Sequence, residues 1–317
     1  MKLLLGCVNS AVSLVGYDWD ARVPFWYCPG NRLRVCGVHA GADRLWIASD
    51  NTLTGLGADG ARVIPLPGPH ENLAHSVKAL GRDALGVADT GNSRVLLYAD
   101  GRRLMEYAPL DGWECPLPPD AIHLNDMIPW RDGILASAFS YQPFAFLKQG
   151  RPGWKQDGLG VLFYMRRHGS RTVSSIAASG LNCPHSVTEH GGDIYCCSSA
   201  EGVFHRFTPA GDGRLEHAQA WRVTGDHFLR GCLRVPGGWA LGGSSTRHVE
   251  GDEDSGMLLY FLSDAGEVES RPVARVGEIY DILPWNDDLM RTVAQQILML
   301  PELPLEGTFP PPCGVTF

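Results

Sequence analysis

Two histidines stand at the beginning of the same short phrase in distant parts of the chain. His75 opens His-Ser-Val-Lys-Ala-Leu-Gly-Arg-Asp and His185 opens His-Ser-Val-Thr-Glu-His-Gly-Gly-Asp, and the two phrases align without a gap. An imidazole can transfer protons near neutral pH, and it is also the common ligand of transition metals. A lone histidine at the start of a strand is more often a hydrogen-bonded core residue. The match between the two phrases is therefore what indicates a functional site.

The same frame recurs four more times with other residues in place of the histidine. Three copies align directly at their Gly or Asp turns, and the weakest copy needs one residue deleted. The aligned first positions are Cys36, His75, Asn125, His185, Arg230 and Tyr280. The positions that follow them are Gly37, Ser76, Asp126, Ser186, Gly231 and Asp281.

Six copies at a mean spacing of about 49 residues predict a repeat protein built from short strands. Asp-Gly and Gly-Asp pairs between apolar runs mark hairpin turns. The pattern predicts an all-β fold, a six-bladed β-propeller in which an N-terminal strand around 3–15 completes the last blade. The rival α/β fold would need alternating amphipathic helices, and the sequence offers one candidate helix, 287–300.

We expect a single domain over 1–317, with the propeller in 1–300 and an extended tail in 301–317. Five prolines in this tail are incompatible with a regular element. The 38 glycines and 22 prolines of the 317 residues are otherwise scattered, as the many turns of a propeller require.

The inner strand of each propeller blade runs along the central channel, so equivalent positions of the repeats meet at one channel mouth. This placement predicts catalytic roles for His75, His185, Tyr280, Asp281 and Asp126. It also predicts that His75, His185 and Asp281 can hold one divalent metal ion, because alternate blades face the axis from three sides. Imidazole ligands favour zinc, iron or copper over calcium, which prefers oxygen ligands.

Four further residues are candidates for binding a small substrate. Arg230 can hold a carboxylate or phosphate, which favours an anionic substrate. Asn125 and Cys36 occupy aligned positions, and His123 lies two residues before Asn125, on the same side if the segment is extended. Structural roles stay open for these residues: Arg230 could pair with a channel carboxylate, and the Asn125-Asp126 pair could form a turn.

The composition excludes several classes of partner. A formal net charge of −8, from 27 Lys and Arg against 35 Asp and Glu, argues against nucleic acid. The apolar runs are too short to span a membrane. Nine cysteines without a Cys-x-x-Cys pair argue against a disulfide framework and favour a cytoplasmic protein. We expect no nucleotide cofactor, and the oligomeric state is left open.

Four short phrases resemble the signature set of a group of poorly characterised bacterial six-bladed propeller proteins. They are His123-Leu-Asn-Asp126, Cys183-Pro-His-Ser186, Phe228-Leu-Arg-Gly231 and Ile279-Tyr-Asp281. The resemblance implies a fold and a shared channel mouth but no activity.

The chain is more remotely similar to regucalcin/gluconolactonase and strictosidine-synthase-type propellers, which implies metal-assisted lactone hydrolysis or condensation at the mouth. The gluconolactonase type binds calcium through carboxylate and amide oxygens, whereas histidines stand at two of the channel positions here. A strictosidine-synthase-like reaction needs an acid, and none of the six aligned positions is a Glu.

Two functions from different classes follow. The first is an enzyme of small-molecule, specialised metabolism that uses His75 and His185 as metal ligands or as an acid/base pair. Its reaction is hydrolysis, elimination or isomerisation, or metal-dependent oxidation. The alternative is a propeller that binds a ligand or partner at the same mouth without chemistry.

Overall fold

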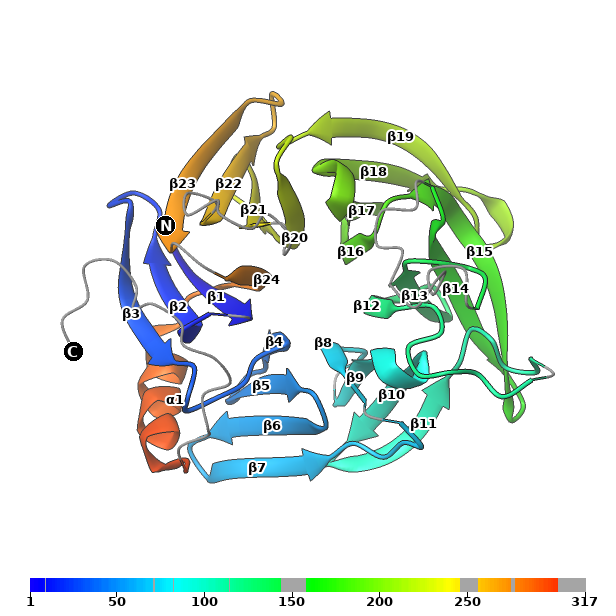
Figure 1. Cartoon of the computed structure of the whole chain (residues 1–317), viewed down its shortest axis with the longest axis horizontal. Coiled ribbons are helices and arrows are strands. Elements are labelled where there is room, and N and C mark those ends of the chain that lie inside the picture. The colour runs from blue at the N-terminus through cyan, green and yellow to red at the C-terminus, as the bar shows by residue number, and fades with distance from the viewer. Residues whose placement is uncertain are drawn as a thin grey trace.

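The computed structural model consists of six four-stranded antiparallel sheets arranged in a ring (Figure 1). It describes residues 1–8, 10–70, 72–81, 83–113, 115–143, 158–245, 256–274 and 277–301. The predicted all-β, six-bladed propeller is confirmed. In every blade, the innermost strand borders the central channel.

Five blades are each built from four consecutive strands. The first contains β4 (Gly37–Ala40), β5 (Arg44–Ser49), β6 (Thr52–Gly57) and β7 (Gly60–Pro65), and the second β8 (Ala74–Ala79), β9 (Ala84–Asp89), β10 (Arg94–Ala99) and β11 (Arg102–Tyr107). The third contains β12 (Leu124–Trp130), β13 (Gly133–Ala138), β14 (Gly160–His168) and β15 (Arg171–Leu181), and the fourth β16 (Pro184–His190), β17 (Asp193–Ser198), β18 (Val203–Pro209) and β19 (Leu215–Arg222). The fifth contains β20 (His227–Val235), β21 (Gly238–Ser245), β22 (Met257–Ser263) and β23 (Val268–Ala274).

The sixth blade joins the two ends of the chain. Its inner strand β24 (Glu278–Pro284) pairs with β1 (Lys2–Val8), which is followed by β2 (Val12–Asp18) and β3 (Val23–Pro29). Closure by the N-terminal segment is confirmed, but this segment supplies three strands where the sequence predicted one. A single strand over 3–15 would be about twice as long as its six- or seven-residue neighbours, so the chain turns after β1.

The apolar run at the start of the chain shows how the blades are held together. Leu3 and Leu5 of β1 pack against the fifth blade, whereas Leu4 between them packs against the first blade. All three side chains are at most 2% exposed. Because neighbouring blades cover both faces of a sheet, both alternating faces of β1 are apolar. Burial of this kind contributes about 1.5–3 kcal/mol for each leucine.

The predicted C-terminal helix is confirmed as α1 (Asp287–Met299). Asn286 caps it by accepting a hydrogen bond from the Leu289 N–H at 3.0 Å, and two aspartates in its first turn suit the helix dipole. Its apolar side packs against the first blade, where Met290 and Val293 are buried. The expected tail begins at the exposed Pro301, and the rest of it lies outside the described residues.

No helix in the described ranges is long and apolar enough to cross a membrane.

Candidate active site

A repeated backbone feature positions the side chains at the channel mouth. In the second, third and fourth blades, the residue two places before the aligned position has a positive φ: 48° at Leu73, 50° at His123 and 50° at Cys183. This conformation turns each carbonyl towards the side chain two residues later. The resulting contacts are His75 Nδ1 to Leu73 O at 2.6 Å, Asn125 Nδ2 to His123 O at 3.0 Å, and His185 Nδ1 to Cys183 O at 2.9 Å.

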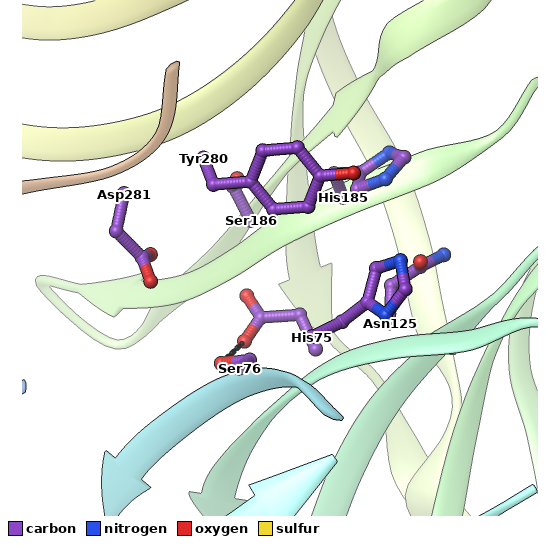
Figure 2. Close-up of a pocket in the computed structure, with 8 residues that line it drawn as sticks. His75, Ser76, Asn125, His185, Ser186, Tyr280 and Asp281 are labelled. Carbon is purple, nitrogen blue, oxygen red and sulfur yellow. Dashed lines mark hydrogen bonds between the residues drawn. The ribbon is translucent and has the colours of Figure 1, made fainter. Parts of the chain in front are cut away.

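Three rings converge from three blades, as the repeat alignment places them. The ring centroid of Tyr280 lies 5.8 Å from that of His75 and 6.5 Å from that of His185. Figure 2 shows the Tyr280 hydroxyl directed towards His185. Between them is a narrow pocket with room for about one water molecule. Its lining residues are His75, Ser76, Asn125, Asp126, His185, Ser186, Tyr280 and Asp281.

His185 is held as a neutral imidazole in one tautomer. Burial and the nearby Arg230 charge hold its pKa well below the usual range. Its Nδ1 faces two oxygens, Cys183 O at 2.9 Å and Ser199 Oγ at 2.8 Å. The Ser199 hydroxyl donates its own proton to Leu229 O, so both oxygens act as acceptors for an Nδ1–H. The Nε2 atom is therefore left with its lone pair.

His75 and His123 have different partners at Nδ1. His75 Nδ1 lies 2.6 Å from Leu73 O, a backbone carbonyl that can only accept, so Nδ1 acts as a donor in this contact. His123 Nδ1 lies 2.8 Å and 3.0 Å from the two carboxylate oxygens of Asp120, a partner that can stabilise an imidazolium. The two rings meet edge to face at 5.0 Å between centroids.

His123 does not reach the site in the way that the sequence predicted. Its φ of 50° breaks the extended geometry, and β12 begins at the next residue, so the alternation that would align it with Asn125 does not apply. It packs instead against Phe139, at 4.2 Å between ring centroids, and Phe139 in turn lies 5.1 Å from His185. An aromatic ring thus separates these two imidazoles.

Asn125 contributes a second buried acceptor to the pocket. Its amide nitrogen donates to His123 O and, at 3.3 Å, to Pro184 O, which fixes the amide orientation because both partners only accept. Among the residues that the structure describes, neither Asn125 Oδ1 nor His185 Nε2 has a hydrogen-bond partner. A buried acceptor without a donor costs about 1–3 kcal/mol, so this pocket favours an occupant that donates.

Arg230 lies beside the pocket rather than in its lining. Its guanidinium pairs with the buried Glu278 carboxylate and stacks over Tyr280, 4.6 Å from the ring centroid. Its charge is thus already balanced by a carboxylate, the structural role that the sequence left open.

The residue after each aligned position connects one blade to the next. Asp126 receives four hydrogen bonds: from the Ser76 hydroxyl at 2.6 Å, Lys78 Nζ at 2.6 Å, the Val187 N–H at 2.8 Å and its neighbour Met127 N–H at 2.9 Å. These partners lie in the second, third and fourth blades. Asp126 is therefore a structural cross-link at the floor of the pocket.

Ser186 and Asp281 make the same kind of link. The Ser186 hydroxyl accepts a hydrogen bond from Gly231 N–H at 2.7 Å, and Asp281 Oδ2 accepts one from Val38 N–H at 2.9 Å. Burial raises the pKa of Asp281 to about 7, although the Lys78 charge opposes the shift. Asp281 is thus both a blade-to-blade acceptor and a group that titrates near neutral pH.

The predicted metal ligands do not form a preassembled centre. Within the described part of the chain, no group of three or more His, Cys, Asp or Glu side chains is placed to hold an ion. His75, His185 and Asp281 line one pocket, but Asp281 is bonded to Val38, and each imidazole packs near the Tyr280 ring, at 5.8 Å and 6.5 Å between centroids. No step of the chemistry is therefore assigned to a metal.

Cys36 lies outside the pocket lining. It is half-buried, and its Sγ is 3.9 Å from Asp50 Oδ1. Gly37, the next residue, packs so closely against the second blade that a Cβ there would stand 2.7 Å from Ser76 Cα. The first blade therefore offers backbone, not a functional side chain, at this position.

Sequence reasoning missed four residues around the site. Asp120 stands three residues before His123, and Glu278 two residues before Tyr280, so proximity to predicted residues was the available signal. Lys78 lies two residues after Ser76 in the same strand, and side chains two residues apart in a strand point to the same face, so its position next to the site could have been predicted. Phe139 lies after the end of β13 and carried no signal. The missed set is Lys78, Asp120, Phe139 and Glu278.

No protein-family model matches the chain, and no curated protein matches it. Solved structures are similar in fold. A protein of unknown function from Bacteroides caccae has a TM-score of 0.63 at 15% identity over 90% of this chain and 99% of its own. A streptogramin B lyase has a TM-score of 0.52 at 11% identity, covering 85% of this chain and 83% of its own.

A putative 6-phosphogluconolactonase from Bacteroides uniformis is also similar, with a TM-score of 0.51 at 15% identity over 86% of this chain and 83% of its own. At these identities the likeness concerns the fold alone. The six-bladed propeller architecture implied by the sequence resemblances is thereby confirmed.

Proposed function

We propose that the protein is an enzyme that transforms a small molecule at the channel mouth by proton transfer, with His185 as the general base. The observation that supports this role is the hydrogen bonding of His185. Cys183 and Ser199 accept from its Nδ1–H, and its buried Nε2 atom has no hydrogen-bond partner among the described residues. A general base must be unprotonated and within reach of the proton it removes. Burial lowers the pKa of His185 and so keeps the ring unprotonated, and His185 lines the pocket in which we place the substrate.

The surroundings of His185 suit a proton that is taken up and then released. Burial and the Arg230 charge disfavour the imidazolium, so a proton accepted at Nε2 returns readily to a leaving group or product. Tyr280 stands on the other side of the pocket with its hydroxyl directed towards His185, where it can donate to or accept from the reacting group (Figure 2).

Proton transfer of this kind serves hydrolysis, elimination and isomerisation. The fold supports this range, because one similar structure is a streptogramin B lyase and another is a putative 6-phosphogluconolactonase. The analogy extends to the architecture and to the use of a propeller as an enzyme scaffold. The residues that carry the proposal are those of this chain.

The state of His185 can be tested without knowing the substrate. In protein labelled with ¹⁵N-histidine, we expect the Nδ1–H tautomer at pH 7. Because burial lowers the pKa of His185, we also expect the ring to stay neutral well below the ordinary imidazole pKa of about 6.5. His185→Phe assigns the resonance. An Nε2–H tautomer, or titration at the ordinary pKa, would contradict the proposed base.

Turnover is tested with a panel of lactones, esters and substrates that eliminate a β-leaving group. A substrate of the wild type should be turned over at least about 100-fold more slowly by His185→Phe. His190→Phe, at the exposed end of the same strand, is the matched control. If His185→Phe turns over every substrate as fast as wild type, the enzyme proposal fails. Ligand binding without turnover would favour the non-catalytic alternative.

Metal dependence is part of the same proposal. Stoichiometric zinc, iron or copper in the purified protein, lost in both His75→Ala and His185→Ala, would assign a metal-assisted version of the reaction. Metal content that is unchanged in both variants would place any ion elsewhere.

A further inference from the structure

We propose that the pocket selects an uncharged substrate group that donates two hydrogen bonds, such as a primary carboxamide, and rejects the carboxylate of the same shape. This inference rests on the proposed function, since it names the substrate class of the same site. It replaces the anionic substrate expected from Arg230 with a neutral donor.

The first observation is a pair of buried acceptors. His185 and Asn125 are 5% and 2% exposed and line one pocket, and no donor within the described residues reaches His185 Nε2 or Asn125 Oδ1. The protein fixes both orientations, because the opposite atom of each group donates to backbone carbonyls. Two lone pairs are therefore presented to whatever enters.

The second observation is the charge balance around the pocket. Arg230 is paired with Glu278 and Lys78 with Asp126. An entering carboxylate would place its oxygens against two acceptor atoms, and the nearby cations already have partners. An entering ammonium would approach Arg230, whose charge already disfavours a cation at His185. A neutral donor avoids both penalties.

The third observation is size and shape. The pocket has room for about one water molecule, which suits the terminal –NH₂ of a carboxamide but not a whole ligand. The remainder of the ligand would lie at the mouth, where the rings of Phe139 and Tyr280 flank His185. An aromatic amide satisfies both requirements.

The test compares benzamide with benzoate, which has nearly the same shape, and with N,N-dimethylbenzamide, which has no N–H and is bulkier. We expect benzamide to shift the ¹⁵N resonances of His185, whereas the other two at the same concentration leave them unchanged. His185→Phe should weaken benzamide binding at least about tenfold, the size of one lost hydrogen bond. His190→Phe should bind benzamide as wild type does.

Three results would overturn the inference. Benzoate could bind as tightly as benzamide, which would restore Arg230 as an anion anchor. Benzamide could bind equally well to His185→Phe, or none of the probes could shift His185, which would leave water as the pocket's only occupant. Each of these is distinguishable from failure of the proposed function, which is decided on the ligand-free protein by the tautomer and titration of His185.

Discussion

Two successive positions of the repeated phrase differ in what their side chains bond to in the structure. At the first position, His75, Asn125 and His185 are fixed through one polar atom, and the remaining polar atom of Asn125 and of His185 is left without a partner in the described structure. At the next position, Asp126 and Asp281 bond to the backbone of a neighbouring blade. One layer presents groups to the channel, and the layer beneath it holds the blades together.

This difference separates function from architecture within one phrase. A residue whose polar atoms are all bonded across a blade boundary stabilises the ring, and its loss lowers the free energy of unfolding. A buried residue with an unpaired acceptor stabilises the fold little and is explained by a ligand. Substitutions at the two layers should therefore affect different measurements.

The largest expected effect is at Asp126. Replacing Asp126 with Ala leaves Lys78 without its counter-ion and the Val187 N–H without its acceptor, so the free energy of unfolding should fall by about 3–5 kcal/mol. Urea denaturation measures the change. Asp264→Ala, which breaks an exposed pair with Arg234, is the control and should leave the free energy of unfolding almost unchanged. An equal loss in both variants would contradict the structural role of Asp126.

Asp281 should make stability depend on pH. Its folded-state pKa of about 7 lies above the ordinary value of 3.8, so the folded state binds the proton more tightly and this contribution to stability declines as pH rises from about 4 to about 7. Asp281→Asn keeps an acceptor for Val38 but does not titrate. Relative to wild type it should gain about 1–3 kcal/mol between pH 5 and pH 8. Parallel stability curves for the two proteins would show that Asp281 is ionised throughout.

His185 should make stability depend on pH in the opposite direction from Asp281, and it should contribute little to stability at pH 7. Its pKa is lowered in the folded protein, so protonation favours the unfolded state, and stability from this group is lost as pH falls below about 6.5. His185→Phe removes this pH dependence. It should change stability at pH 7 by about 1 kcal/mol or less, because the loss of the Nδ1 contacts with Cys183 and Ser199 is offset by removal of an unpaired buried acceptor. A loss as large as that of Asp126→Ala would place His185 in the structural layer.

Most of the fold and part of the candidate site could be predicted from the repeat. Because each blade reuses one phrase, aligning the copies was enough to predict six blades, closure by the N-terminus and the convergence of His75, His185 and Tyr280. What the alignment could not supply was the tertiary pairing of charges. Glu278 neutralises Arg230 across a blade boundary, and no local pattern records which carboxylate a guanidinium meets. His123 was misplaced for a local reason, since a positive φ is uncommon for any residue other than Gly and the sequence gives no sign of it here.

The smallest expected effect is at Cys36, which like Arg230 occupies an aligned first position but lies outside the pocket lining. Its half-buried thiol lies 3.9 Å from Asp50 Oδ1, and the close packing of the first blade against the second comes from Gly37. Cys36→Ala should therefore change the free energy of unfolding by less than about 0.5 kcal/mol and leave the His185 resonances unchanged. Gly37→Ala should be clearly destabilising, because its methyl group would meet the Ser76 backbone. If Cys36→Ala alters the titration of His185, the first blade belongs to the functional layer after all.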